Sequence, residues 1–335
     1  MKNNQKKFDF VAIGDITTDA FIRIKEANIS CDLNREKCMI CMRFADKIPY
    51  DFVKIVPAVG NSANAAVSAA RLGLSSALIS DVGDDYQGAE CIEGLKKSGV
   101  ITDFVRAHSN KKTNYHFVLW FEDERTILIK HEDFNYDGIP ETMGAPKWLY
   151  LSSLGEQSAL FHSRIAKFLH DHPEINLAFQ PGTFQMRLGR EKLADIYKHA
   201  KVFVCNVAEA QKVLMTQEND VKKLMKSLSE FGPKIVLVTN GPKGAYAYDG
   251  NDYWFMPPYP DPKPPYERTG AGDAFSSTFV SAVALGKSVP CALMWAPINS
   301  MSVVQYVGAQ EGLLTREKLE EYLANAPAEY KPKKI

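Results

Sequence analysis

The run Glu267-Arg-Thr-Gly-Ala-Gly-Asp273 holds the residues of this chain best suited to chemistry. Three small residues, Gly270, Ala271 and Gly272, directly precede a helical pattern over 273–285. Consecutive backbone N–H groups in such a run can point at one spot, and the helix dipole adds partial positive charge. The run therefore predicts an anion site, suited to the charge that develops on a transferred phosphoryl group.

Asp273 lies in the first turn of that helix, where a carboxylate is electrostatically favoured and stays ionised. An ionised carboxylate beside an anion site can accept a proton from an attacking hydroxyl group, so Asp273 is a candidate general base. The alternative is structural, because Gly-Asp before a helix is also a common capping pattern.

Apolar runs alternate with amphipathic segments along most of the chain, and these elements must position the site. Strands are expected at 8–13, 77–82, 148–152, 176–179, 202–205 and 235–238. Helices are expected at 63–72, 86–98, 158–170, 191–199, 221–231, 273–285, 289–306 and 315–324. Strands separated by helices predict an α/β fold with a mostly parallel central sheet that is covered on both faces.

Two stretches, 20–57 and 113–131, break this rhythm and are expected to form a small β lid above the main sheet. Arg125 on the second stretch can reach over a substrate or be a solvated charge, and the solvated charge is favoured. His116 and His131 are expected at the surface. The stretch is also rich in aromatic residues. These rings can stack on a base, pack the lid or form a dimer interface, and they are Tyr115, Phe117, Trp120 and Phe121.

Residues 1–330 are expected to form a single domain with a loose tail at 331–335. The lid makes a homodimer plausible, because an exposed apolar sheet face favours a partner. The 40 basic and 40 acidic residues cancel, which argues against a nucleic-acid partner. The lack of a long apolar run or an uncharged leader segment predicts no membrane association and a cytoplasmic protein.

The sequence excludes several enzyme classes, because it contains no P-loop, HExxH or GxSxG motif and no protein kinase signature. The glycine run at 270–272 lacks the third glycine of a dinucleotide-binding turn. Six cysteines are too few for a disulfide scaffold at this length, and Cys38-Met-Ile-Cys41 has no second half of a zinc site. Reduced thiols are therefore expected.

Four segments resemble the signatures of the ribokinase-like (PfkB-type) carbohydrate and nucleoside kinases. The segment TGAGDAF at 269–275 resembles that family's C-terminal signature, and 60–73 is similar to its N-terminal glycine/asparagine signature. Residues 206–209 are similar to the family's NxxE, and 239–244 to its nucleotide-binding turn. Because the four occur in the family's order, the resemblance implies a ribokinase-like three-layer α/β sandwich with a small β lid.

The resemblance also implies roles for particular positions. Asp273 matches the catalytic base, and Gly270, Ala271 and Gly272 match the anion hole. Substrate hydroxyl groups are expected to bind at Asp19, Gly60 and Asn64. Nucleotide contacts are expected at Asn206, Thr239, Gly241 and Gly244. Glu209 is expected to bind Mg²⁺ through water molecules.

Structural alternatives exist for three of these positions. Asp19 suits a turn after a strand, Asn64 suits a helix cap, and Glu209 suits a solvated first turn. The chain also departs from the family's pattern. Where the family usually has two consecutive glycines, this chain has Val59 and Gly60. Around the fifth strand it has Gln180-Pro-Gly-Thr instead of the family's Asp-Pro, and it has Pro297 where the family often has an asparagine near the nucleotide base. Glu267 replaces an aspartate that helps to hold a monovalent cation in several members, so K⁺ activation is left open.

The sequence thus predicts an ATP-dependent, Mg²⁺-requiring kinase that phosphorylates a hydroxymethyl group of a sugar or nucleoside, with Asp273 as general base. The alternative is a catalytically weak sugar- or nucleotide-binding regulator on the same fold. The intact Asp273 and glycine run favour the enzyme, because a binding protein has no need of a base.

Overall fold

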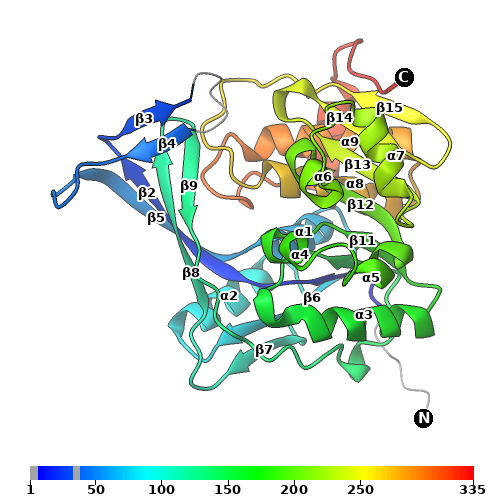
Figure 1. Ribbon diagram of the computed structural model, residues 1–335, viewed down its shortest axis with the longest axis horizontal. Helices are drawn as coiled ribbons and strands as arrows, with labels where there is room; N and C mark the ends of the chain where they lie inside the picture. Colours follow the sequence, from blue (N-terminus) through cyan, green and yellow to red (C-terminus); the bar gives the residue numbers. More distant parts are fainter. Residues whose placement is uncertain (1–6, 33–37) are drawn as a thin grey trace.

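The computed structural model describes residues 7–32 and 38–335, and its centre is a ten-stranded sheet between two layers of helices (Figure 1). The strands that run parallel are, in spatial order, β7 (Val105–His108), β6 (Ser76–Gly83), β1 (Phe10–Ile13), β10 (Trp148–Leu151), β11 (Asn176–Phe179), β12 (Ala200–Asn206) and β13 (Ile235–Thr239). The sheet continues with antiparallel strands β14 (Ala245–Tyr248), β15 (Tyr253–Met256) and β16 (Lys333–Lys334).

Both faces of the parallel strands are buried, which explains why they are continuous apolar runs rather than alternating ones. In β1, Phe10 and Ala12 join one hydrophobic cluster, whereas Val11 and Ile13 join the cluster on the opposite face. The first layer contains α1 (Asn61–Arg71), α2 (Tyr86–Lys97), α8 (Ala271–Ala284) and α9 (Val289–Val303), with α10 (Arg316–Ala324) on α9. The second layer contains α3 (Ala159–Asp171), α5 (Ala194–His199), α6 (Val207–Leu214) and α7 (Val221–Ser229). Shorter helical segments are α4 (Thr183–Leu188), η1 (Glu141–Met143), η2 (Glu156–Ser158) and η3 (Gly241–Lys243).

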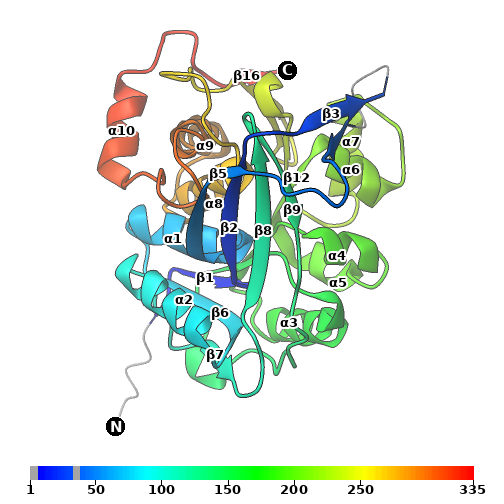
Figure 2. The same cartoon turned by 90° about the vertical axis from the view of Figure 1, so that its left-hand side faces the viewer.

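A second sheet of four strands forms the lid, and Figure 2 shows it in front of the main domain. Its order is β5 (Tyr50–Val59), β2 (Thr17–Ile24), β8 (Asn114–Phe121) and β9 (Glu124–Leu128). The β2–β8 pair is parallel and the outer pairs are antiparallel. Phe21, Val118 and Trp120 on its inner face pack against Val307 of the main domain, which fixes the lid sheet in place.

The expected fold class is confirmed: a mostly parallel sheet covered on both faces, with a small β lid built from both predicted stretches. The sequence analysis missed the short elements β7, β14, β15, α4 and α6. Elements of four to eight residues show too few periods to be distinguished from loops. Within the described residues, no helix is long and apolar enough to cross a bilayer.

Two expectations are corrected. The tail is held, not loose, because β16 pairs with β15, Tyr330 is buried, and the Ile335 N–H donates to the Tyr253 carbonyl. Reduced thiols were expected throughout, but Cys31 and Cys38 form a disulfide. They are opposite each other in the hairpin of β3 (Asn28–Cys31) and β4 (Cys38–Cys41), a pairing that the sequence spacing alone does not reveal. The remaining four cysteines are free.

Candidate active site

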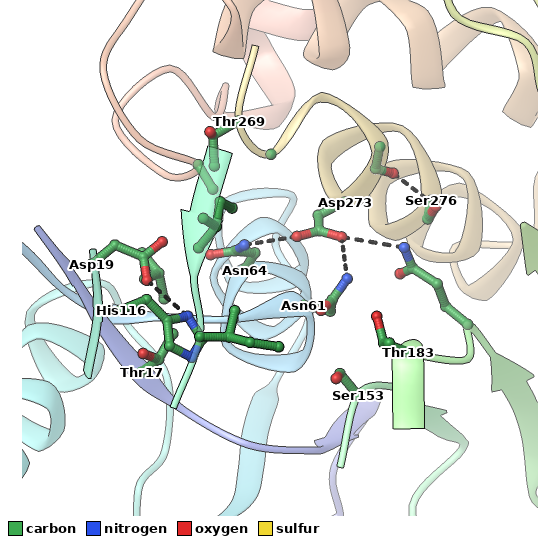
Figure 3. A pocket seen from close by; sticks show the side chains of 18 of the residues that line it. Thr17, Asp19, Asn61, Asn64, His116, Ser153, Thr183, Thr269, Asp273 and Ser276 are labelled. Atoms are coloured by element: carbon green, nitrogen blue, oxygen red, sulfur yellow. Dashed lines mark hydrogen bonds and ion pairs between the residues drawn. The ribbon is translucent and has the colours of Figure 1, made fainter. Parts of the chain in front are cut away.

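A cavity of about 380 Å³ lies between the inner face of the lid and the ends of the parallel strands (Figure 3). Ligand sites of open parallel sheets form at the carboxyl ends of the strands, and Asn206 and Thr239 end β12 and β13 there. The predicted positions that line this cavity are Asp19, Gly60, Asn64, Asn206, Glu209, Thr239, Gly270, Gly272 and Asp273. Residues from five distant segments are therefore brought together as the sequence predicts.

Asp273 lies in the first turn of α8, with three side-chain amides around its carboxylate (Figure 3). Asn61 Nδ2 donates to Oδ1 at 2.8 Å and Asn64 Nδ2 to Oδ2 at 2.8 Å. Gln180 Nε2 also donates to Oδ1, at 3.2 Å. Burial raises the pKa of Asp273, while these three amides and the charge of Arg125 oppose that rise. The carboxylate is thus held as a hydrogen-bond acceptor facing the cavity.

The loop before α8 has a shape that only glycine permits at one position. Gly270 has φ 83°, and a Cβ there would lie 2.3 Å from the Ala309 Cβ atom. The helix starts at Ala271, so the N–H groups of its first turn have no acceptor within the helix, although the Ala271 N–H donates to the Arg268 carbonyl at 3.5 Å. Gly270 and Gly272 at this turn line the cavity. The buried carboxylate of Glu267 accepts from the N–H and hydroxyl of Thr269, which fixes the loop from behind. The loop thus has the position that the expected anion site requires, and its binding of an anion stays a prediction.

The structural alternatives for two substrate positions are wrong. Asn64 lies inside α1 rather than at its cap, and its side chain also accepts from Gln310 at 3.0 Å. Asp19 lies within β2 rather than in a turn, and it is 6% exposed. Gly60, with φ 116°, precedes α1 and lines the cavity beside Asn61. Asn61 was not singled out in the sequence, although it stands next to Gly60 in the same signature.

The expectations for the charged residues of the lid are corrected. His116 is only 9% exposed, and its Nδ1 atom lies 3.4 Å from Oδ1 of Asp19. His131 Nδ1 pairs with Oδ2 of Asp15 at 3.1 Å. Arg125 lines the cavity as well, with its side chain 29% exposed. His116 and Arg125 lie on the inner face of the lid sheet, and His131, which follows β9, lines the same cavity. The sequence could not show which face of the sheet His116 and Arg125 would occupy.

The lid aromatics do not line the cavity. Trp120 is fully buried in the contact between lid and main domain, with its ring edge-on to Phe52 and Tyr266. Phe117 lies on the opposite face of β8 and is 46% exposed. The lining contains one large carbocyclic ring, that of Phe184. Of the three roles that were considered for these rings, packing of the lid is confirmed for Trp120.

A second cavity, of about 540 Å³, adjoins the first at Thr239 and Gly272, which line both. Gly241 and Gly244, the other two positions of the expected nucleotide turn, line this second cavity together with Ala271. Its walls are largely apolar and rich in proline. The two cavities therefore meet where the first turn of α8 begins.

Asn206 and Glu209 form a reciprocal cap at the start of α6. The Glu209 N–H donates to Asn206 Oδ1 at 2.8 Å, and the Asn206 N–H donates to Glu209 Oε2 at 2.9 Å. Burial raises the pKa of Glu209, the two bonds with Asn206 oppose the rise, and the negative charge of Asp273 adds to it. Within the described residues no group of three or more metal-ligating side chains occurs. Glu209 thus fits a hydrated Mg²⁺ that is held mainly by phosphate, and not a closed protein cage.

Comparisons with family models and with known protein sequences indicate one family, and comparison with solved structures shows the fold. Residues 53–316 match the family model described as pfkB family carbohydrate kinase. The chain is 28% identical over 274 residues to the ribokinase of Bacillus subtilis, covering 79% of this chain and 87% of that protein. It is 29% identical over 306 residues to the probable chloroplastic fructokinase-6 of Arabidopsis thaliana, covering 80% and 74%. The Arabidopsis thaliana ribokinase complexed with ribose and ATP has the same fold, with a TM-score of 0.77, 20% identity, and coverage of 95% and 99% of the two chains.

Proposed function

The chain belongs to the pfkB family of carbohydrate kinases, and on that premise we propose that it transfers the γ-phosphate of ATP to a hydroxymethyl group of a sugar. One observation carries the proposal: the carboxylate of Asp273, held by three amides, adjoins the open first turn of α8 at the junction of two cavities. A base and an anion site are thus adjacent where phosphoryl transfer needs both.

In the proposed reaction Asp273 accepts the proton of the substrate hydroxyl group as its oxygen attacks phosphorus. Gly270, Ala271 and Gly272 present backbone N–H groups to the charge on the transferred group. Glu209 and Asn206 lie at the same cavity and would hold Mg²⁺ through water. A Mg²⁺ ion held there would neutralise part of the negative charge on the phosphates.

We propose that the nucleotide occupies the second cavity, along Thr239, Gly241 and Gly244. This cavity adjoins the anion site at Gly272, so a base bound there directs its phosphates toward Asp273. The Arabidopsis thaliana ribokinase complexed with ribose and ATP supports the view that this fold can bind a sugar and a nucleotide together. A requirement for K⁺ stays open, because Glu267 here accepts hydrogen bonds from Thr269 within its own loop.

A sugar suits the first cavity better than a nucleoside. A nucleobase needs an apolar or aromatic surface on which to stack, and the lid aromatics lie in the lid's core or on its outer face. The cavity is lined mostly by carboxylate, amide, hydroxyl and imidazole groups, which match the hydroxyl groups of a sugar.

The first experiment is ADP release from ATP–Mg²⁺ over a panel of pentoses, hexoses, phosphosugars and nucleosides, with and without K⁺. We expect turnover with a free sugar and weaker turnover with any nucleoside. Turnover with nucleosides alone contradicts the sugar assignment. Silence across the whole panel contradicts the kinase itself and favours the alternative, a sugar- or nucleotide-binding regulator on the same fold.

Substitution of the base tests the mechanism separately from the substrate. Asp273→Asn is expected to lower kcat by about 10²–10⁴-fold, the usual contribution of a general base. Binding of ATP, measured by calorimetry, is expected to persist because the second cavity is unchanged. Turnover close to that of the unmodified protein would remove Asp273 from this role.

A further inference from the structure

Asp19 and His116 leave hydrogen-bonding atoms without partners at the edge of the first cavity. As whole residues, Asp19 and His116 are 6% and 9% exposed. Among the described residues, the Oδ1 atom of Asp19 and the Nε2 atom of His116 have no hydrogen-bond partner. The contact between Asp19 Oδ1 and His116 Nδ1, at 3.4 Å, is an ion-pair distance rather than a hydrogen bond. Buried polar atoms of proteins are rarely left in this state, so the occupant of the cavity is expected to supply the partners.

The two side chains are fixed relative to each other by the lid sheet. Asp19 of β2 and His116 of β8 are directly paired in parallel register, so they lie on the same face of neighbouring strands. Figure 3 shows both side chains at the wall of the cavity, across from Asp273. A substrate whose reacting hydroxymethyl group is at Asp273 therefore places its far side against this pair.

We propose that His116 is a specificity-determining residue that, together with Asp19, binds two adjacent ring hydroxyl groups of the sugar; this rests on the proposed kinase function. A hydroxyl group both donates and accepts. One hydroxyl donates to the carboxylate of Asp19, and its neighbour meets Nε2 of His116. The pair thus selects a substrate with a vicinal diol and rejects one that lacks either oxygen.

Charges near the pair favour neutral hydroxyl groups over an anionic substituent. Asp19 itself is a carboxylate, and Asp15 lies behind His131 with Tyr136 also donating to it. A carboxylate or phosphate of a substrate at this wall would meet the negative charge of Asp19 directly. Hydroxyl groups instead give Asp19 the donors that it lacks.

The test compares D-ribose with 2-deoxy-D-ribose and 3-deoxy-D-ribose by kcat/KM and by the shift in unfolding temperature that each sugar produces. The unmodified protein is expected to prefer ribose about 10- to 100-fold over the analogue that lacks the oxygen bound by His116. In His116→Ala the preference for ribose over that analogue is expected to fall to about threefold or less. The preference for ribose over the other deoxyribose is expected to be retained. His116→Gln, which keeps a polar group, is expected to restore part of it.

The lid variant Thr126→Ala is the matched control, because Thr126 is exposed on the opposite face of β9 and is expected to leave the ribose preference unchanged. His116→Gln also covers the case in which the alanine variant does not fold. The inference is overturned if the unmodified protein treats the three pentoses alike, if it neither binds nor phosphorylates any of them, or if both His116 variants keep the full preference. Turnover of another sugar in those cases would leave the kinase function standing.

Discussion

Amide groups, more than charges, set the environment of the residue to which catalysis is assigned. Asn61, Asn64 and Gln180 each donate to the Asp273 carboxylate, so all three favour its ionised form. Burial acts in the opposite direction and leaves the pKa of Asp273 raised. Because its pKa is raised, Asp273 is protonated, and so lost as a base, at a higher pH than an exposed aspartate. The acidic limb of the kcat/KM profile should therefore report the balance between burial and these amides.

Asn61→Ala is predicted to move that acidic limb to higher pH. The variant removes one hydrogen-bond donor to the Asp273 carboxylate, which raises the pKa of Asp273 further. Asp273 therefore remains protonated at pH values at which it is ionised in the unmodified protein. Well above the limb the loss of activity should be smaller. The check is a kcat/KM profile of both proteins with the best sugar of the panel. An equal loss at every pH would mean that Asn61 positions substrate instead of tuning the base.

Single residues were predictable where type and position are sufficient to define a role. Asp273 and the glycine run stood out because they belong to one of four segments that resemble family signatures and occur in the family's order. Asn61 and His116 did not. The role of Asn61 depends on the contact between α1 and α8, and that of His116 on the register of β8 against β2. A shift of one residue in that register would have turned His116 to the outside.

At the scale of elements, the start of α8 holds most of the residues to which the proposed chemistry is assigned. Its first residue follows Gly270, whose left-handed backbone brings the chain against Ala309. Gly272, two residues later, has open space where a Cβ atom would lie, and it lines both cavities. The two glycines therefore have different tasks: the first permits the turn, and the second leaves room for ligand.

Gly270→Ala and Gly272→Ala are predicted to separate these tasks. The added methyl group at Gly270 meets Ala309 in a conformation that alanine disfavours by about 1–2 kcal/mol, so both stability and activity should fall. At Gly272 the methyl group meets no atom within 4 Å, and alanine favours a helix, so stability should be kept or rise by up to about 1 kcal/mol. Its kcat should nevertheless fall, because the methyl group enters the space of the transferred phosphate. Urea unfolding and turnover measure the two effects; equal stabilities for both variants would contradict the assignment.

Most long elements of the main domain were predictable, and the strands of the lid were less so. Helices such as α1, α2, α3 and α8 and the buried parallel strands show local patterns, either helical spacing or a continuous apolar run, that do not depend on the rest of the fold. The strand β2 was not identified as one element, since its polar Thr17 and Asp19 face the cavity and interrupt the apolar pattern. The polar residues that line the cavity therefore obscured the strand signal.

At the scale of the whole molecule, the outer face of the lid is apolar and lacks cover. Ile55, Ala20, Phe117 and Leu128 are paired in one row across all four strands. Three of them are 46–56% exposed. The inner face of the same sheet lines the first cavity. Whatever covers the outer face would therefore also restrain the wall that contains Asp19 and His116.

We propose that a second copy of the chain covers this face, and the prediction is a homodimer that Phe117→Glu dissociates. A glutamate in the middle of the row would have to be desolvated in the interface, which opposes association. Leu160→Glu is the matched control: Leu160 is 63% exposed on α3, in the second helix layer, and its replacement should leave the dimer intact. Sedimentation velocity over a range of concentrations distinguishes the species. If dimerisation restrains the lid, KM for the sugar should rise in Phe117→Glu while ATP binding is kept. A monomeric unmodified protein, or a dimer that survives Phe117→Glu, would show that the lid is not the interface.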